Sequence, residues 1–396
     1  MDRAALSVAA PLVMKDLGLD AADLGIIFSS FFAGYTLFTF IGGYAADVLG
    51  PKRVFTLAMT LWSTFCGLTA AAVGFTSLLV LRTIFGFGEG PFGAAANKMV
   101  GHWFPRRQIA TAIGLANAGT PIGGALAGPV AGWLAVRYGW RTSFVALACV
   151  GFLWTFFWFL VVVDRPETPK KLSDSERAES DVNDSSTPLR KSKLSLFFYL
   201  RQPTVIATGI SFFGYAYILY FFLSWFPMYL TMAQHLSIRD MGFVNTIPWL
   251  LGAVGLTFSG VVCDLLSRTS SNVLRARKLV LVIGLILAAI CVTLAGLSSG
   301  LAWAVAFMAM AIFFVYLTGT TYWAILQETV PSEHMGATGG FVHLIANCAG
   351  IMGPAVTGFI VQTAGVFTSA FLLAGGVALL GALLVAIFVK PIVEPV

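Results

Sequence analysis

Residues 43–53 read GYAADVLGPKR, and this short segment joins two long apolar runs at residues 22–46 and 53–74. It places one carboxylate a few residues ahead of a Lys-Arg pair. Short loops rich in Lys and Arg are typical of one side of polytopic membrane proteins. The segment therefore predicts two consecutive membrane-spanning helices joined by a basic turn.

A second copy of this segment lies 217 residues further along the chain, where SGVVCDLL at 259–266 matches GGYAADVL at 42–49. Both copies contain Gly-x-x-x-Asp, and both lead into a basic loop. Two further pairs of landmarks repeat in the same order at offsets of 226 and 225 residues. Three landmarks in one order indicate two similar halves. The two further pairs are Trp-Phe-Pro at 103–105 with Thr-Val-Pro at 329–331, and Gly-Pro at 128–129 with Gly-Pro at 353–354.

The composition is that of a chain that lies almost wholly in a membrane. Hydrophobic residues make up 58% of the 396 residues, charged residues make up only 11%, and the mean hydropathy is +0.86. Soluble domains carry about 25% charged residues, so this chain could not cover soluble domains with a polar surface. The net charge of +6 resides in short loops, which argues for a membrane topology signal and against a nucleic-acid partner.

The apolar runs define the expected spans, since a membrane-spanning helix needs about 20 residues. A first, shorter run at 4–14 crosses only about half of a hydrocarbon core ~30 Å thick, at ~1.5 Å per residue. We therefore expect that the first helix is truncated and that the natural chain begins upstream of Met1. The eleven full runs are 22–46, 53–74, 76–100, 108–135, 141–163, 204–230, 238–263, 279–298, 300–327, 335–362 and 366–389.

One long polar stretch divides the spans into two sets of six. It is rich in Ser, Asp and Glu, a composition that cannot bury a core. The sequence thus predicts an all-α polytopic membrane protein with two six-helix bundles related by a pseudo-twofold repeat. Its expected parts are an N-terminal bundle (1–163), a central cytoplasmic loop (164–203) and a C-terminal bundle (204–396).

The distribution of Lys and Arg predicts the orientation. Most of these residues lie in loops on the side of the central stretch. The opposite loops hold only Lys15, Arg137, Arg141 and Arg239. By the positive-inside rule, we expect an inner-membrane protein whose central loop and two termini are cytoplasmic.

Several short motifs of the chain occur together in one known family. They are residues 43–53, RTIFGFGEG at 82–90 with WFP at 103–105, DRAALSVAAP at 2–11 and FLSWFPMYL at 222–230. The first resembles the signature of the major facilitator superfamily between spans two and three. The others resemble the anion:cation symporter family within it. The resemblance covers essentially the whole chain. It implies the major facilitator fold and a proton-coupled carrier of hexonates, hexuronates, aldarates, tartrate or other organic acids.

One position departs from the pattern of that family. Its sugar-acid carriers usually have Gly-x-x-Asn in the eleventh span, whereas this chain has Gly340-Phe-Val-His343, with Asn347 one turn later. The resemblance therefore leaves the exact ligand open.

Four ionisable residues lie inside the N-terminal spans, where a charge costs several kcal/mol: Asp2, Arg3, Arg82 and Glu89. Arg82 and Glu89 are seven residues apart, so they project from nearly the same helix face. Asp2 and Arg3 would supply a second acid–base pair. Because a carboxylate in apolar surroundings can exchange protons near neutral pH, we expect Asp2, Glu89 and Arg82 to couple protons. The alternative is a buried pair that merely fastens its helix.

The substrate carboxylate is expected at Arg3, helped by Tyr35 in the second span, because a guanidinium holds a carboxylate by two parallel hydrogen bonds. The C-terminal spans offer neutral and aromatic groups that suit the hydroxyls of such an anion. For each aromatic residue taken singly, core packing or an interfacial belt is the alternative. The C-terminal candidates are Ser224, Trp225, Thr320, Trp323, His343 and Asn347.

Another set of residues lies at the cytoplasmic ends of spans, and we interpret it as a gate: Gly43, Asp47, Lys52, Arg53 and Asp264. Simple solvation of helix ends is the alternative. Glycines in the fifth span are predicted to let it pack closely against the eighth; they are Gly114, Gly119, Gly123, Gly124 and Gly128.

Taken together, these features favour import of a small organic anion with protons by alternating access. A proton-driven exporter would share residues 43–53, and a non-transporting sensor would need a larger soluble domain. The sequence contains no hydrolase or metalloprotease motif and no metal-ligand spacing, so neither an enzyme nor a cofactor or metal site is expected. The expected partners are the anion, protons and the lipid bilayer, with no nucleic acid and a monomeric chain.

Overall fold

A computed structural model of the 396-residue chain describes residues 1–104, 106–163, 195–270 and 272–392. Within these ranges every regular element is a helix. Most of the central loop expected at 164–203 lies outside the described residues.

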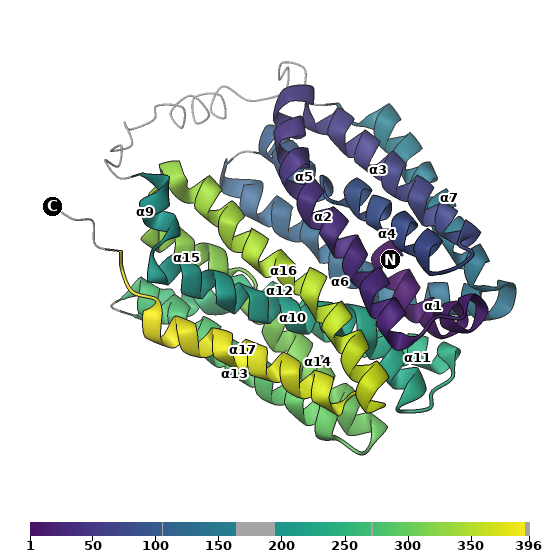
Figure 1. Ribbon diagram of the computed structural model, residues 1–396. Helices are drawn as coiled ribbons and strands as arrows, with labels where there is room; N and C mark the ends of the chain where they lie inside the picture. Colours follow the sequence, from purple (N-terminus) through teal and green to yellow (C-terminus); the bar gives the residue numbers. More distant parts are fainter. Residues whose placement is uncertain (105, 164–194, 271, 393–396) are drawn as a thin grey trace.

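The N-terminal elements form one bundle, which is drawn in purple and blue in Figure 1. They are α1 (Asp2–Leu17), α2 (Ala21–Leu49), α3 (Pro51–Leu68), the short 3-10 helix η1 (Thr69–Ala71), α4 (Phe75–Glu89), α5 (Phe92–Trp103), α6 (Arg106–Tyr138) and α7 (Trp140–Val161).

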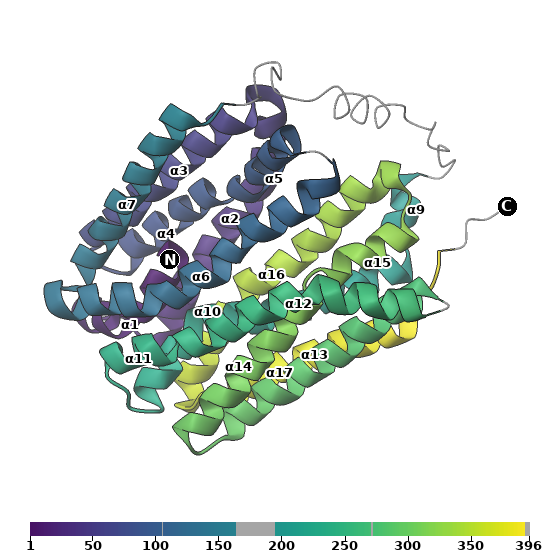
Figure 2. The ribbon, with the colours of Figure 1, turned by 180° about the vertical axis from the view of Figure 1, so that it is seen from behind.

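The C-terminal elements form a second bundle, and Figure 2 shows it from behind in green and yellow. They are α9 (Leu196–Leu200), α10 (Pro203–Met232), α11 (Ile238–Val244), α12 (Thr246–Thr269), α13 (Val273–Leu297), α14 (Leu301–Thr318), α15 (Thr321–Thr329), α16 (Ser332–Ala364) and α17 (Thr368–Phe388).

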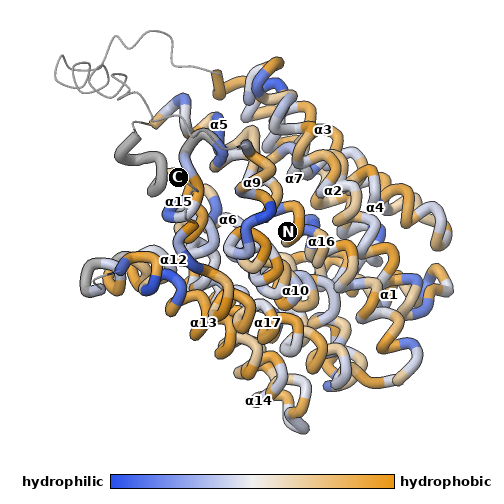
Figure 3. Tube along the Cα trace, turned by 60° about the vertical axis from the view of Figure 1, so that its left-hand side comes forward, coloured by the Kyte–Doolittle hydropathy of each residue, from blue (hydrophilic) through white to orange (hydrophobic). Residues whose placement is uncertain are grey.

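The helices have the length and hydropathy of membrane spans. Nine spans within the described residues are long and apolar enough to cross a bilayer. Figure 3 shows the hydrophobic residues along the helices and many of the hydrophilic residues near their ends. The predicted class, an all-α polytopic membrane protein, is thus confirmed.

Three of the expected spans are not single helices. The run at 76–100 is divided into α4 and α5, the run at 238–263 into α11 and α12, and the run at 300–327 into α14 and α15. The first two divisions have a common cause, because Pro91 and Pro248 lack the N–H that a continuous helix would use. The third falls at Gly319, a residue that favours a helix poorly.

The two bundles pack tightly at one end through residues without side chains. A Cβ atom on Gly128 of α6 would lie 2.3 Å from the carbonyl oxygen of Gly242 in α11, and one on Gly124 would lie 2.5 Å from the Trp249 ring in α12. These contacts confirm that the fifth span packs against the eighth. Gly114 and Gly119 have no neighbouring atom within 4 Å, so these two glycines do not serve that packing.

The same end is also joined through α2 and α16. A Cβ atom on Gly25 would lie 2.6 Å from the carbonyl oxygen of Pro354. Ser29 Oγ accepts a hydrogen bond from the Ala355 N–H at 3.0 Å. Figures 1 and 2 both show the bundles leaning apart toward the opposite end, which carries α5, α9 and α15. On α2 in that direction, Phe40 is 84% exposed. The bundles are therefore in contact at the end of the turn between α1 and α2, called the closed end, and their helices diverge toward the end that carries α5, α9 and α15, called the open end.

Candidate functional site

The glycines of α4 bring three helices together around one position. A Cβ atom on Gly86 would lie 2.2 Å from the carbonyl oxygen of Phe31 in α2, and one on Gly90 would lie 2.7 Å from that of Tyr35. On the other side of α4, a Cβ atom on Gly88 would lie 2.6 Å from the backbone nitrogen of Trp62 in α3. The run Gly-x-Gly-x-Gly thus lets α2 and α3 approach α4 beside its last residue, Glu89.

Glu89 forms an ion pair with Arg3 of α1. Its Oε1 atom accepts hydrogen bonds from Arg3 Nη2 at 2.6 Å and from Arg3 Nε at 3.1 Å. The Arg3 guanidinium also lies over the rings of Phe31 and Tyr35, 5.1 Å and 4.8 Å from their centroids. The two pairs that the sequence suggested, Arg82 with Glu89 and Asp2 with Arg3, are therefore replaced by a pair between Glu89 of α4 and Arg3 of α1. Tyr35 does lie beside Arg3, as the sequence predicts.

Arg82 is buried among aromatic rings. It is 1% exposed, and its guanidinium carbon lies 4.5 Å from the centroid of the Phe85 ring and 5.3 Å from that of Phe31. Within the described residues, its Nε and Nη1 atoms have no hydrogen-bond partner, and the same holds for Glu89 Oε2. Arg82 and Glu89 share a helix, but no ion pair joins them in the described part of the chain, so Arg82 retains hydrogen-bonding capacity for an anion.

The carboxylate of Asp2 is held by a residue that the sequence did not single out. Trp62 Nε1 of α3 donates a hydrogen bond to Asp2 Oδ2 at 2.7 Å. Asp2 and Arg3 therefore do not form the expected acid–base pair. A tryptophan in an apolar span gave no signal of this role, because most such residues pack in a core or at the membrane interface.

A small cavity lies between the two bundles at the level of both arginines. Its volume is about 10 Å³, which is about the space that one water molecule needs. Ser7 of α1 and Ser224 of α10 contribute hydroxyls to it. An organic acid could not fit there without movement of the surrounding helices. The lining residues are Arg3, Ser7, Phe28, Phe31, Phe32, Arg82, Leu223 and Ser224.

The C-terminal bundle contributes a chain of neutral polar groups. Tyr220 of α10 donates a hydrogen bond from its hydroxyl to Asn347 Oδ1 at 3.0 Å, and Asn347 Nδ2 lies 3.5 Å from His343 Nδ1. The Tyr220 ring packs on Phe32 of the N-terminal bundle, with 4.2 Å between centroids. Tyr220 was not predicted from the sequence. His343 and Asn347 lie together, as expected.

Of the other residues predicted to contact the substrate, one is exposed and two are hydrogen-bonded to other residues of the protein. Trp323 is 39% exposed, with its ring centroid 6.0 Å from that of His343. Thr320 is hydrogen-bonded to Ser259, at 2.6 Å between the two hydroxyls. Trp225 is fully buried, and its Nε1 donates to the Pro354 carbonyl at 3.1 Å. In this conformation, therefore, Trp225 joins α10 to α16, and its N–H is already occupied.

The predicted gate residues lie at the open end of the molecule. Asp47 forms an ion pair with Lys98 of α5 at 2.6 Å, and the same Lys98 Nζ donates to the Ala46 carbonyl at 2.9 Å. Lys98 was not predicted, because the sequence alone does not show that α5 lies beside the end of α2. Lys52 lies over the Phe159 ring at 5.1 Å.

The other residues of the predicted gate are Arg53, Gly43 and Asp264. Arg53 is exposed, and a Cβ atom placed on Gly43 would lie 3.8 Å from the Cβ atom of Ala94. The side chain of Asp264 lies outside the described residues. In the C-terminal bundle, an ion pair at 2.9 Å joins Arg277 to Glu328.

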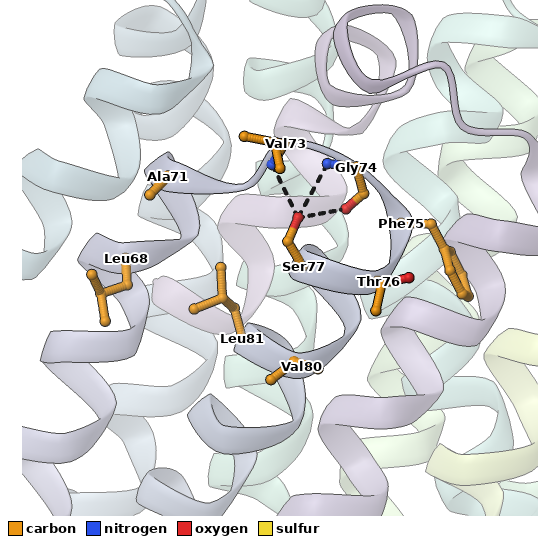
Figure 4. Close-up of a pocket in the computed structure, with 9 residues that line it drawn as sticks. All are labelled: Leu68, Ala71, Val73, Gly74, Phe75, Thr76, Ser77, Val80 and Leu81. Atoms are coloured by element: carbon orange, nitrogen blue, oxygen red, sulfur yellow. Dashed lines mark hydrogen bonds between the residues drawn. The ribbon is translucent and has the colours of Figure 1, made fainter.

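A larger hollow lies away from these groups and does not have the chemistry of a polar site. Figure 4 shows its lining, which is mostly aliphatic and comes from the end of α3, η1 and the start of α4. The Ser77 hydroxyl there accepts hydrogen bonds from the N–H groups of Val73 and Gly74 and donates to the Gly74 carbonyl. The Ser77 hydroxyl thus caps the start of α4 and has its hydrogen bonds within that turn. The cluster around Arg3 remains the candidate site.

Comparison with known proteins places the whole chain in one group. Residues 1–354 match the Major Facilitator Superfamily. The chain is 46% identical over 395 residues to the hexuronate transporter of Bacillus subtilis (strain 168), with 99% of this chain and 92% of the relative covered. It is 30% identical over 406 residues to a probable galactarate/D-glucarate transporter of the same strain, with coverages of 99% and 89%. The crystal structure of a D-xylose-proton symporter has the same fold, with a TM-score of 0.76 at 18% identity and coverages of 98% and 94%.

Proposed function

This chain belongs to the Major Facilitator Superfamily, and we propose that it imports a hexuronate or a related sugar acid together with protons by alternating access. It is a multi-pass membrane transporter of sugar acids and not an enzyme. The coupling to protons, the direction of transport and the residues below belong to the proposal.

The similarity to a hexuronate transporter over nearly the full chain supports the class of substrate. The residues around the cavity fit that chemistry. The guanidinium of Arg3 suits a carboxylate, since Arg binds such groups with two parallel hydrogen bonds. Tyr220, His343 and Asn347 offer donors and acceptors for hydroxyls. A sugar acid that binds between the bundles would thus contact charged groups on one side and neutral groups on the other.

The ion pair between Arg3 and Glu89 is the observation that carries the coupling mechanism. In this conformation Arg3 is held by the transporter's own carboxylate, that of Glu89, which would therefore compete with the carboxylate of the substrate. A proton on Glu89 removes the negative charge and weakens this bond. Arg3 is then free to bind the sugar acid, so that proton binding favours substrate binding. Arg82 keeps a second positive charge at the same cavity.

Orientation and alternating access complete the proposal. The loops at the open end carry most of the Lys and Arg residues, which favours placing this end in the cytoplasm of a cell whose inner membrane the protein spans. The conformation is then open toward the inside. Movement of the bundles would separate α2 from α16 at the outer end and close the inner end, where Asp47, Lys98 and the basic turn at 52–53 lie. One chain contains both bundles, so a monomer suffices.

Right-side-out membrane vesicles with an imposed proton gradient test this function. Vesicles that contain the transporter should accumulate labelled D-galacturonate, a hexuronate, when the outside is more acidic, and an uncoupler should abolish the accumulation. Equal accumulation with and without the uncoupler would refute proton coupling. Net extrusion of the sugar acid under the same gradient would instead support the exporter alternative.

A further inference from the structure

Trp62 makes a direct contact with the ionisable cluster through a group that can only donate. Its Nε1–H lies 2.7 Å from Asp2 Oδ2, whereas Arg3 bonds Glu89. An indole N–H has no acceptor capacity, so it favours a carboxylate that offers a free lone pair. A hydrogen bond to the charged form of an acid stabilises that form relative to the protonated one.

The packing of α3 against α4 fixes the position of this donor. Gly88 leaves no side chain between the two helices at the level of Trp62, and an added Cβ there would lie 2.6 Å from the Trp62 backbone nitrogen. The indole ring also packs edge-to-face on Phe92 of α5, with 5.6 Å between centroids. The backbone and the ring of Trp62 are thus both held, so the donor cannot easily turn away from Asp2.

We propose that Trp62 is a positioning residue that sets the pH at which Asp2 takes up a proton, and this inference rests on the proton coupling proposed above. Among the described residues, the other ionisable side chains around Asp2 are Arg3 on α1, Cys66 on α3, and Arg82 and Glu89 on α4. Among the described hydrogen bonds, that from Trp62 is the side-chain contact to the Asp2 carboxylate. Its removal makes Asp2 bind its proton at a higher pH.

The variant Trp62→Phe keeps an aromatic ring and removes the donor. Purified transporter in proteoliposomes is assayed for counterflow of labelled D-galacturonate at equal inside and outside pH, over a series of pH values. The alkaline limb of the wild-type profile should move upward by about one pH unit, as expected for the loss of a hydrogen bond to a charged group. The matched control is Trp158→Phe, because Trp158 stacks on Phe55 at 4.3 Å and is not bonded to Asp2.

The outcomes separate this inference from the proposed function. A wild-type profile that is flat with pH would refute the proton coupling and the role of Trp62 with it. A pH-dependent wild type with an unshifted Trp62→Phe profile would refute the role of Trp62 alone. So would an equal shift in Trp158→Phe.

A second measurement needs no active Trp62 variant. The protein contains ten tryptophans, whose indole N–H groups can be labelled with nitrogen-15 and followed by NMR in detergent. One indole signal of the wild-type protein should titrate with the midpoint of the counterflow profile, and this titration should be lost in Asp2→Asn. A spectrum in which no indole signal follows that midpoint contradicts the inference.

Discussion

The two bundles have similar helical architecture, but their side chains place different chemical groups at the space between them. The N-terminal bundle lines the cavity with two guanidiniums and holds the carboxylates of Asp2 and Glu89 close to them, with Arg3 and Glu89 joined at 2.6 Å. The C-terminal bundle faces them with the neutral series Tyr220, Asn347 and His343. A duplicated fold thus specifies the helices and their packing, while the side chains of each copy were free to specialise. Transport of a hydroxylated anion needs both kinds of group.

The largest effect is expected at Glu89. Glu89→Gln cannot lose or gain a proton and no longer neutralises Arg3, so gradient-driven accumulation of D-galacturonate should be abolished while counterflow continues. Uptake and counterflow in the same proteoliposomes measure the two activities. Asp240→Asn is the matched control, because Asp240 is an exposed carboxylate bonded to Ser237 outside the cavity. Accumulation by Glu89→Gln at the wild-type rate would show that Glu89 of the N-terminal bundle does not carry the coupled proton.

Arg3 should show the next largest effect. Arg3→Lys keeps the charge but loses the planar pair of donors, so the affinity for D-galacturonate should fall more than about tenfold, or about 1.4 kcal/mol. Equilibrium binding to the purified protein gives the dissociation constant. Arg141→Lys is the control, since Arg141 pairs with Asp16 at the closed end of the molecule. Equal affinities of Arg3→Lys and wild type would place the substrate carboxylate elsewhere.

His343 tests the neutral side of the comparison, with a smaller effect. His343→Asn introduces the residue that the resemblance to sugar-acid carriers predicts at this position and changes one hydrogen-bonding group, which is worth about 0.5–1.5 kcal/mol. The variant should change the order of stabilisation by D-galacturonate, galactarate and D-galactonate by a few-fold in thermal-shift titrations. Trp225→Phe, at a buried site between α10 and α16, should leave that order unchanged. An equal loss for all three acids would assign His343 to packing.

The joint between the bundles should give the smallest change in transport. Gly128→Ala places a Cβ atom 2.3 Å from the Gly242 carbonyl oxygen, so α6 and α11 must separate. We expect a lower melting temperature and a modest decrease in uptake. Gly119→Ala adds the same methyl group on the same helix where no atom lies within 4 Å, and it should behave as wild type. Identical melting curves for the two variants would show that the closed end does not depend on this contact.

The sequence predicts the classes of element well and their mutual contacts poorly. Hydropathy alone locates the spans. Of the glycines expected to pack α6 against the eighth span, Gly124 and Gly128 make that contact, whereas Gly114 and Gly119 do not. The position of Pro91 could have signalled the division of the fourth span. In contrast, the bond between Arg3 and Glu89 joins residues 86 positions apart, so it depends on how α1 and α4 are rotated relative to each other. Helical periodicity shows which residues share one face of a helix, but it does not show which other helix packs against that face.

The roles of Trp62 and Lys98 were hidden for the same reason. Trp62 resembles any core aromatic residue until α3 is placed against α1, and Lys98 resembles any loop cation until α5 is placed beside Asp47. Tyr220 is likewise one aromatic residue among many in α10. Polar contacts between helices far apart in sequence follow from packing, and packing follows from small residues such as Gly88 that carry no chemistry of their own.

The size of the small cavity at the two arginines also bears on the electrical insulation of the membrane. A conducting chain of water molecules would have to cross a hydrocarbon layer about 30 Å thick, yet the space at Arg3 and Arg82 accommodates about one molecule between Phe28, Phe31 and Phe32. This cavity therefore has no room for a continuous file of water molecules. We expect idle copies of the carrier in this conformation to leave the voltage across the membrane intact.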